Sequence, residues 1–261
     1  MSTTDIGYAG LAASLVLVGV VVVLSLWQHL GVERTVVAAV ARALVQLLIV
    51  GVALDLVLDE DRSLVWSWLW VAVIVVTAAL TVRHRAPEVP GIGWSALAAY
   101  VLALGTCLTV VFGLDVFPLE ARTLVPVAGM IVGNSMRSAV VTARNLADLL
   151  SARRADIEAR LALGMSGRDA LRPSLRSAIR LGLLPQVDAT RTVGLVALPG
   201  TMTGLILAGV DARDAVLVQA ALLFLILGSA AIAVTVVGLW TARWAVTPDQ
   251  RFVHVDRPVE D

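Results

Sequence analysis

The chain alternates between long apolar stretches and mostly short polar connections. Most of the stretches reach or approach the ~20 residues that a helix needs to cross the ~30 Å hydrocarbon core of a bilayer. The pattern therefore predicts an all-α, polytopic membrane protein with about seven transmembrane helices. The stretches are residues 6–27, 36–58, 64–82, 94–114, 124–142, 192–210 and 214–240.

One connection differs from the others in length and composition. Residues 143–191 are polar, rich in arginine and helical in pattern, since Ile157, Leu161 and Leu163 recur at near-helical spacing. They predict a helical insert outside the membrane. Its arginines can face anionic lipid, an acidic partner or solvent, and the pattern leaves these alternatives open.

The placement of arginine predicts the orientation of the chain. Loops on the cytoplasmic side of a membrane carry an excess of basic residues. With the N-terminus outside and the C-terminus inside, the insert and the C-terminal tail hold most of the arginines on the cytoplasmic side. We therefore expect a multi-pass protein of the inner (cytoplasmic) membrane, with residues 1–261 as one transmembrane domain and residues 143–191 as its cytosolic insert.

The composition excludes several other classes of protein. Hydrophobic residues make up 59% of the chain and charged residues 15%, against about 45–50% and about 25% in soluble domains. A soluble enzyme, a disordered chain and a disulfide scaffold are therefore excluded. The 20 basic residues are balanced by 20 acidic ones, so no nucleic-acid partner is expected. The single Cys107 forms no intrachain disulfide and no cysteine metal site.

Polar side chains inside apolar stretches are candidates for function, because burying them in lipid is costly. Arg42 and Gln46 in the second stretch are four residues apart and share one helix face. They can line a pathway that opens to the cytoplasm. Alternatively, Arg42 is a structural residue bound to headgroups and carbonyl groups.

The fifth stretch carries small and polar residues near its middle. Gly129 and Gly133 form a GxxxG motif, which lets another helix approach closely. Asn134 and Ser135 follow at mid-depth, where an amide needs a partner from a neighbouring helix or from a passing substrate. These four residues are predicted to line a translocation pathway or to pack helices together.

The sixth stretch contains a potential break. Pro199 and Gly200 lie near its middle, and Gly200 and Gly204 form a second GxxxG motif. Thr201 and Thr203 can satisfy the carbonyl groups that a proline leaves free. A broken helix can expose backbone groups to a substrate, whereas a kink serves only the packing. Both interpretations remain open, so these five residues are candidates for the pathway or for helix packing.

The chain lacks motifs for catalysis and for a metal cage. HExxH, Walker A and GxSxG are absent. Met130, Met136 and Met202 are soft potential metal ligands, although methionine more often fills gaps in packing. We expect a transport protein rather than an enzyme, with no cofactor bound by this chain. Energy for uphill transport would come from a partner or from an ion gradient.

Several motifs, in order along nearly the whole chain, carry a resemblance to a known family. They read GMIVGNSM at 129–136, IEARLALG at 157–164, LLPQVDATRTVGLVALPGTMTG at 183–204 and ILAGVDARDAVLVQ at 206–219. Arg42 followed by Gln46-Leu47-Leu48 adds an R-x3-QLL pattern. The chain resembles the FetB/YbbM family, which consists of permease subunits of an iron-export ABC transporter.

This resemblance implies partners and roles that the residues alone do not show. It implies a homodimer in lipid, bound to two copies of a cytosolic ATP-binding subunit that carries ATP and magnesium. Glu158, Ala159 and Gly164 resemble the EAA-x3-G loop of ABC importer permeases, and this implies that they couple the chain to that subunit. Pairing with Arg154 is the alternative role for Glu158.

Two positions depart from the family pattern. Arg137 stands where the family typically has Asn, and Thr201 stands where it typically has Met, which removes one soft ligand. Both departures bear on how this chain would handle a metal.

Three functions follow from these observations. The first is an ABC permease subunit that exports iron or another metal. Plant aluminium-tolerance permeases linked with nucleotide-sugar transport look like relatives, so the second is an ABC permease for an organic solute. The third is a gradient-driven carrier or an intramembrane enzyme. A carrier would pair membrane acids with a coupling ion, and the deep parts of the predicted stretches contain no acids.

Thiol labelling tests the predicted orientation. In a Cys107→Ala background, Glu120→Cys should react with an impermeant thiol reagent applied from outside intact cells. Ser166→Cys, in the insert, should react only after the cells are opened. The reverse labelling pattern would overturn the orientation.

Overall fold

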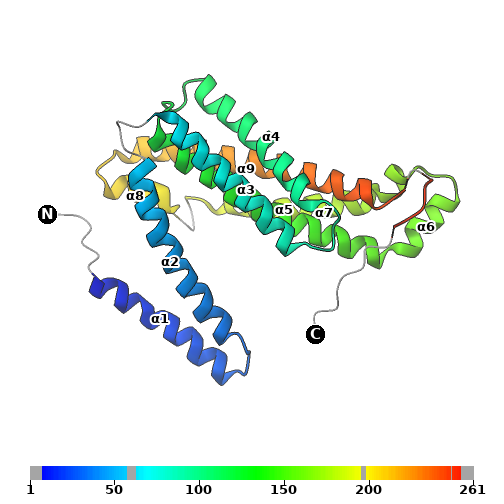
Figure 1. Ribbon diagram of the computed structural model, residues 1–261, viewed down its shortest axis with the longest axis horizontal. Coiled ribbons are helices and arrows are strands. Elements are labelled where there is room, and N and C mark those ends of the chain that lie inside the picture. Colours follow the sequence, from blue (N-terminus) through cyan, green and yellow to red (C-terminus); the bar gives the residue numbers. More distant parts are fainter. Residues whose placement is uncertain (1–7, 58–62, 195–197, 248, 254–261) are drawn as a thin grey trace. The chain divides into compact units, whose positions relative to one another are not determined.

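The computed structural model describes residues 8–57, 63–194, 198–247 and 249–253. Its regular elements in these ranges are all α-helices (Figure 1), together with one isolated antiparallel bridge between Val246 and Phe252. The all-α class is therefore confirmed. The helices fall into two compact units, Met1–Arg62 and Ser63–Asp261.

The first unit is a pair of packed helices, α1 (Tyr8–Trp27) and α2 (Glu33–Val57). The turn between them is held by Ser25, whose hydroxyl donates a hydrogen bond of 2.9 Å to Glu33 Oε2 and accepts one of 3.3 Å from the Val32 amide. Most apolar side chains of this unit are exposed. Such a surface is suited to lipid rather than to water.

The second unit is built around α5, which packs against α3, α7 and α9, while α4 covers α3 and α9 (Figure 1). Its main core consists mostly of alanine and valine. Small side chains let membrane helices approach closely, so van der Waals contact can replace the missing hydrophobic effect. The helices are α3 (Leu64–Arg85), α4 (Ile92–Gly113), α5 (Ala121–Ala152), α6 (Arg154–Ala162), α7 (Gly167–Thr192), α8 (Gly200–Leu207) and α9 (Ala212–Trp244).

Three contacts bring the end of α3, the start of α4, the later part of α5 and the last turns of α9 to a common level. Arg144 Nε donates a hydrogen bond of 2.6 Å to the Arg85 carbonyl, which joins α5 to the end of α3. Gly93 lies against the Arg83 side chain, and Gly91 lies against the indole of Trp240. Arginine and tryptophan concentrate at membrane interfaces. We call this the Arg–Trp level, and in the predicted orientation it marks the cytoplasmic interface.

The predicted insert, residues 143–191, occupies two environments. Its first part extends α5 beyond the Arg–Trp level, and α6 follows there. Ile157 of α6, Leu146 and Leu150 of α5 and Leu171 of α7 join the end of α9 in a second, smaller core. The insert is therefore a packed extension of the helical bundle and not a separate loop.

The second half of α7 returns alongside α5 and α9. A side chain on Gly182 would overlap the Thr142 hydroxyl and lie 3.1 Å from the Ser138 carbonyl oxygen. Gly238 of α9 also lies close to α7, because a side chain built there would be 3.0 Å from Leu175 and 3.2 Å from Ile179. Since the sequence predicts that Ser138 and Thr142 lie within a membrane span, the last part of the insert runs beside that span.

The sixth predicted stretch, residues 192–210, is not a continuous helix. Regular helix ends at Thr192 in α7 and resumes at Gly200 in the short helix α8. Within the described residues, five helices are long and apolar enough to cross a membrane, and Ala13–Trp27 is a shorter apolar helix. The sixth stretch thus contains the potential break that Pro199 and Gly200 indicated, and α8 forms most of its second half.

The contact at Gly182 can be tested by adding volume there. Gly182→Val should push α7 away from α5 and destabilise the fold, since overpacking a well-packed site costs about 1–3 kcal/mol. The measurement is the thermal unfolding midpoint of the detergent-solubilised protein. Gly105→Val in α4 is the matched control, because no atom lies within 4 Å of a side chain built at Gly105. Equal midpoints for the two variants would contradict the packing.

Candidate functional site

The end of α7 lies far from the Arg–Trp level along the direction of the bundle. Gly182 contacts Ser138 and Thr142, which are two to six residues along α5 from Arg144. Asp188 and Arg191 follow Gly182 by roughly 9 Å and 13 Å of helix at about 1.5 Å per residue. Counted from the Arg–Trp level, this run of helix is comparable to half the thickness of a bilayer core of about 30 Å.

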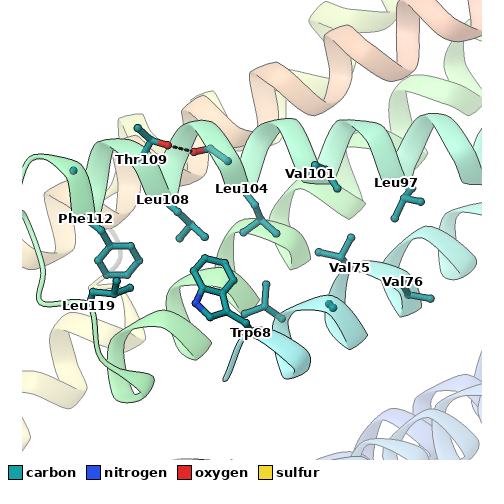
Figure 2. Close-up of a pocket in the computed structure, with 14 residues that line it drawn as sticks. Trp68, Val75, Val76, Leu97, Val101, Leu104, Leu108, Thr109, Phe112 and Leu119 are labelled. Carbon is teal, nitrogen blue, oxygen red and sulfur yellow. Dashed lines mark hydrogen bonds between the residues drawn. The ribbon is translucent and has the colours of Figure 1, made fainter. Parts of the chain in front are cut away.

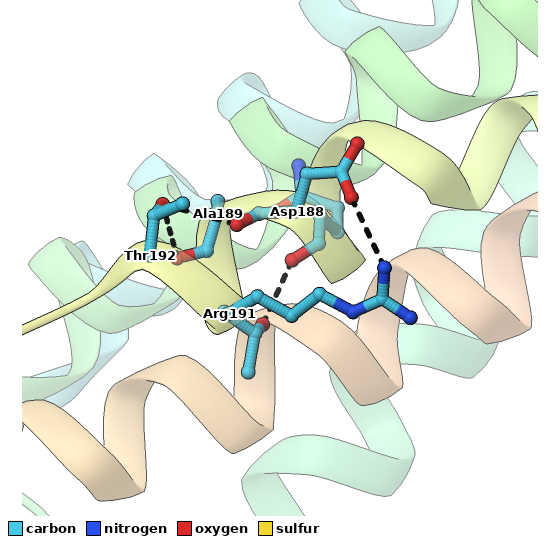
Figure 3. Close-up of polar contacts among 6 residues, drawn as sticks. Asp188, Ala189, Arg191 and Thr192 are labelled. Atoms are coloured by element: carbon cyan, nitrogen blue, oxygen red, sulfur yellow. Dashed lines mark hydrogen bonds and ion pairs between the residues drawn. The ribbon is translucent and has the colours of Figure 1, made fainter. Parts of the chain in front are cut away.

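An ion pair occupies this depth on the surface of α7 (Figure 3). Arg191 Nη1 lies 3.7 Å from Asp188 Oδ1, and the side chains are 73% and 63% exposed. The Thr192 hydroxyl donates a hydrogen bond of 3.0 Å to the Asp188 carbonyl oxygen as the helix ends. Asp188 lies outside the predicted stretches, so the expectation that their deep parts contain no acid stays a prediction.

The helix that follows the break, α8, begins after Pro199. Pro199 is the N-cap residue of α8, and the Thr203 amide and hydroxyl donate hydrogen bonds of 3.0 Å and 3.1 Å to its carbonyl oxygen. This carbonyl group already accepts a backbone bond of α8, whereas the carbonyl that a proline at position 199 leaves free lies outside the described residues, so the predicted role of Thr203 stays a prediction. Gly200 and Thr201 open α8 and are exposed. Of the two interpretations of this segment, the structure shows a broken helix and not a kink.

A second polar pair lies on α5 at a comparable depth. Asn134 Nδ2 donates a hydrogen bond of 2.8 Å to the Met130 carbonyl, and Asn134 Oδ1 accepts one of 2.8 Å from Arg137 Nη2. The guanidinium group of Arg137 is therefore directed along α5 away from the Arg–Trp level. Its side chain is exposed. The residue that departs from the family pattern thus belongs to an exposed polar surface of α5.

The GxxxG glycines do not pack helices within the described part of the chain. No atom of the described chain lies within 4 Å of a side chain built on Gly129, Gly133, Gly200 or Gly204. The two predicted roles, pathway and helix packing, therefore both require something outside this chain's own described helices, either a solute or a second protein surface.

The remaining candidates on α5 and α8 are Ser135 and three methionines, and all are buried or half-buried. Ser135 is fully buried, and its hydroxyl has no hydrogen-bond partner among the described residues. Met130 and Met136 pack against the main core, and Met202 is half-buried. Within the described residues, no group of three or more His, Cys, Asp or Glu side chains could hold a metal ion.

Arg42 and Gln46 lie in the first unit, one helical turn apart on α2, and both are exposed. Their shared face was predicted from the spacing, and the unbroken helix from Glu33 to Val57 provides it.

The tip of the insert lies between α6 and α7. Glu158 forms an ion pair of 2.8 Å with Arg154, so the alternative role predicted for Glu158 is present. Ala159 is exposed. Gly164 ends α6 with φ +86°, a left-handed conformation that favours glycine. Beside it, Leu163 is 84% exposed although it is apolar. The tip therefore presents apolar surface away from both cores.

The second unit has a large hollow whose lining is almost entirely apolar (Figure 2). It measures about 780 Å³ and is lined by apolar side chains of α3 and α4, among them Trp68, Leu104 and Phe112. Thr109, its one hydroxyl-bearing lining residue, already donates a hydrogen bond of 2.7 Å to the Gly105 carbonyl. Such a hollow can hold a lipid chain or another helix but offers little to a polar solute.

Comparison with known proteins agrees with this architecture. The model of the uncharacterised protein family UPF0014 matches residues 8–245. The chain belongs to this family. It is 32% identical over 247 residues to the probable iron export permease protein FetB of Escherichia coli, and the match covers 93% of each chain. The resemblance to FetB is thereby confirmed.

Two plant members of UPF0014 are similarly close. The chain is 35% identical over 222 residues to the UPF0014 membrane protein STAR2 of Oryza sativa, covering 84% of this chain and 77% of that one. It is 33% identical over 225 residues to the protein ALUMINUM SENSITIVE 3 of Arabidopsis thaliana, covering 85% and 81%. No solved structure matches the chain.

For this UPF0014 member, three relevant residues were missed by sequence reasoning. Asp188 and Arg191 were assigned to the cytosolic insert because arginines surround them. The signal that could have shown that this part of the insert packs beside α5 is the apolar run around Gly182, which is too short to count as a span by itself. Leu163 was taken only as part of a helical repeat, and nothing in the sequence shows that it ends at an exposed tip.

Proposed function

We propose that this UPF0014 member is the membrane-spanning permease subunit of an ABC transporter that exports iron or another metal. The observation that carries this proposal is the match to the probable iron export permease FetB over 93% of both chains. ATP is hydrolysed by a separate cytosolic subunit, since this chain has no nucleotide-binding motif.

The shape of the insert supports coupling to such a subunit. Ile157 is 2% exposed and fixes α6 to the second core, while Leu163 and Met165 project beside Gly164 at the tip. From this tip α7 runs as one helix to Arg191 and the break. A partner bound at the tip would therefore act through a continuous helix on the polar groups at mid-depth.

The open glycines support a homodimer. Gly129 and Gly133 on α5 and Gly200 and Gly204 on α8 are spaced for close helix approach but meet no atom of the described chain. In the proposed transporter, they meet a second copy or border the route between two copies.

An organic solute is the second candidate for the exported substrate. It is favoured by the lack, within the described residues, of any cluster of His, Cys, Asp and Glu side chains that could hold a metal ion. The membrane architecture and the coupling to ATP hydrolysis are the same in both cases.

Docking is tested at Leu163. Leu163→Asp should leave expression and membrane insertion unchanged, because the side chain is 84% exposed and belongs to neither core. It should greatly reduce co-purification with the ATP-binding subunit, since a charge opposes burial in an apolar interface. Gly164 is a poorer test position, because its left-handed conformation strains any substitution.

The matched control for docking is Ala155→Asp, an exposed position on the same short helix. It adds the same charge away from the tip and should leave co-purification intact. Full ATP-dependent transport by Leu163→Asp would show that the tip is not the docking element.

Cell iron tests the substrate. Deleting the gene should raise total iron under iron load and increase sensitivity to peroxide, because free iron converts peroxide into damaging radicals. The chain supplied from a plasmid should restore both values. Unchanged iron content would favour the organic solute.

A further inference from the structure

The exposed Asp188–Arg191 pair at the end of α7 does not fit a lipid-facing surface. Placing a charged side chain at the centre of a bilayer is costly, so such groups face the protein interior or a water-filled cavity. Both side chains are nevertheless more than 60% exposed, and the pair shares a single contact of 3.7 Å. Their surroundings in the membrane must therefore include water, a polar solute or a second protein surface.

Among the described residues of this segment, the pair lies next to Val193, Gly194, Leu198 and Pro199, which are outside the helices. Regular helix stops at Thr192, one residue after Arg191, and resumes at Gly200. Irregular backbone at membrane depth is tolerated where it is buried in protein or lines a water-filled cavity. The ion pair and the break thus both indicate that the end of α7 borders a water-filled cavity.

The balance of charge on this surface is positive. The described charged groups at mid-depth on α5 and α7 are Arg137, Arg191 and Asp188. Asp188 is held by Arg191, whereas each guanidinium group has five N–H donors and is seen to use one side-chain contact. A bare metal cation would meet one carboxylate that is already paired. An anionic oxygen group would meet an arginine with donors to spare.

We propose that the end of α7 lines the solute route, and that Arg191 binds a carboxylate or phosphate group of the solute there. The transported species is then an anion: either a metal complexed by carboxylates or an organic phosphate. This inference rests on the proposed transport function, which it deepens by giving the chemical class of the substrate.

Thiol chemistry tests the route without a substrate or a partner. In a Cys107→Ala background, Ala189→Cys is placed between the two charged residues, and Ala189 is exposed. It should react in membrane vesicles with charged, water-borne methanethiosulfonates. Val101→Cys is the control, since Val101 is 58% exposed and lies roughly 15 Å along α4 from Gly91 at the Arg–Trp level. It faces apolar surroundings and should not react.

The charge of the reagent tests the role of arginine. Relative to their rates with a free thiol, the sulfonate-bearing reagent should label Ala189→Cys faster than the trimethylammonium-bearing one. Adding Arg191→Gln should remove this preference, and adding Arg213→Gln, at an exposed position near the start of α9, should not. No labelling at Ala189→Cys, or a preference for the cationic reagent, would overturn the proposal.

Transport distinguishes the two sources of the anion. The probes are ferric citrate, UDP-glucose and uncomplexed ferrous iron, in proteoliposomes containing the chain and its ATP-binding partner. One of the anionic probes should be transported with ATP, and Arg191→Gln should lower its rate by roughly tenfold or more, as expected for loss of a hydrogen bond to a charged group. Arg191→Lys should retain part of the rate, and Arg213→Gln all of it.

The outcomes separate this inference from the function on which it rests. Transport of uncomplexed ferrous iron alone, unaffected by Arg191→Gln, would overturn the anion site and leave the transporter intact. Loss of all ATP-dependent transport together with no bound ATP-binding subunit would overturn the proposed function, while selective sulfonate labelling of Ala189→Cys would still support the wet, arginine-lined surface.

Discussion

The architecture of the second unit depends on the close approach of α7 to α5 at Gly182. A single added carbon at this position would overlap the Thr142 hydroxyl. Since interiors are packed as densely as crystals, such a contact cannot be widened without moving the helix. It determines that α7 returns along the bundle, and so it determines the depth at which Asp188, Arg191 and the break are found.

The sequence predicted the elements that depend on local pattern. The apolar stretches became α1 to α5 and α9 because each has enough apolar residues in a row to form a long helix, and the helical pattern around Ile157 became α6. The proline-glycine pair at Pro199 also indicated the break correctly. In each case, the information lies within about 20 neighbouring residues.

The course of α7 could not be predicted in the same way. Its first half is rich in arginine because it packs beyond the Arg–Trp level, and its second half is too short to look like a membrane span. Only the contact of Gly182 with a helix 40 residues earlier reveals that one helix joins both environments.

The same limit applies to the open glycines of α5 and α8, whose spacing is visible in the sequence but whose partner is not. Likewise, the link between Arg137 and Asn134 follows from helix spacing, but its exposure follows from the packing of α5.

The interruption after Thr192 has a mechanical consequence. A hydrogen-bonded helix resists changes in length, so a displacement at the tip beside Leu163 is carried along α7 to Arg191. Regular helix does not continue from there into α8, and α8 packs against the start of α9. Axial movement of α7 can therefore end at the break, leaving α8 in place. In the proposed transporter, the two ends of the bundle would then be able to move one after the other rather than together.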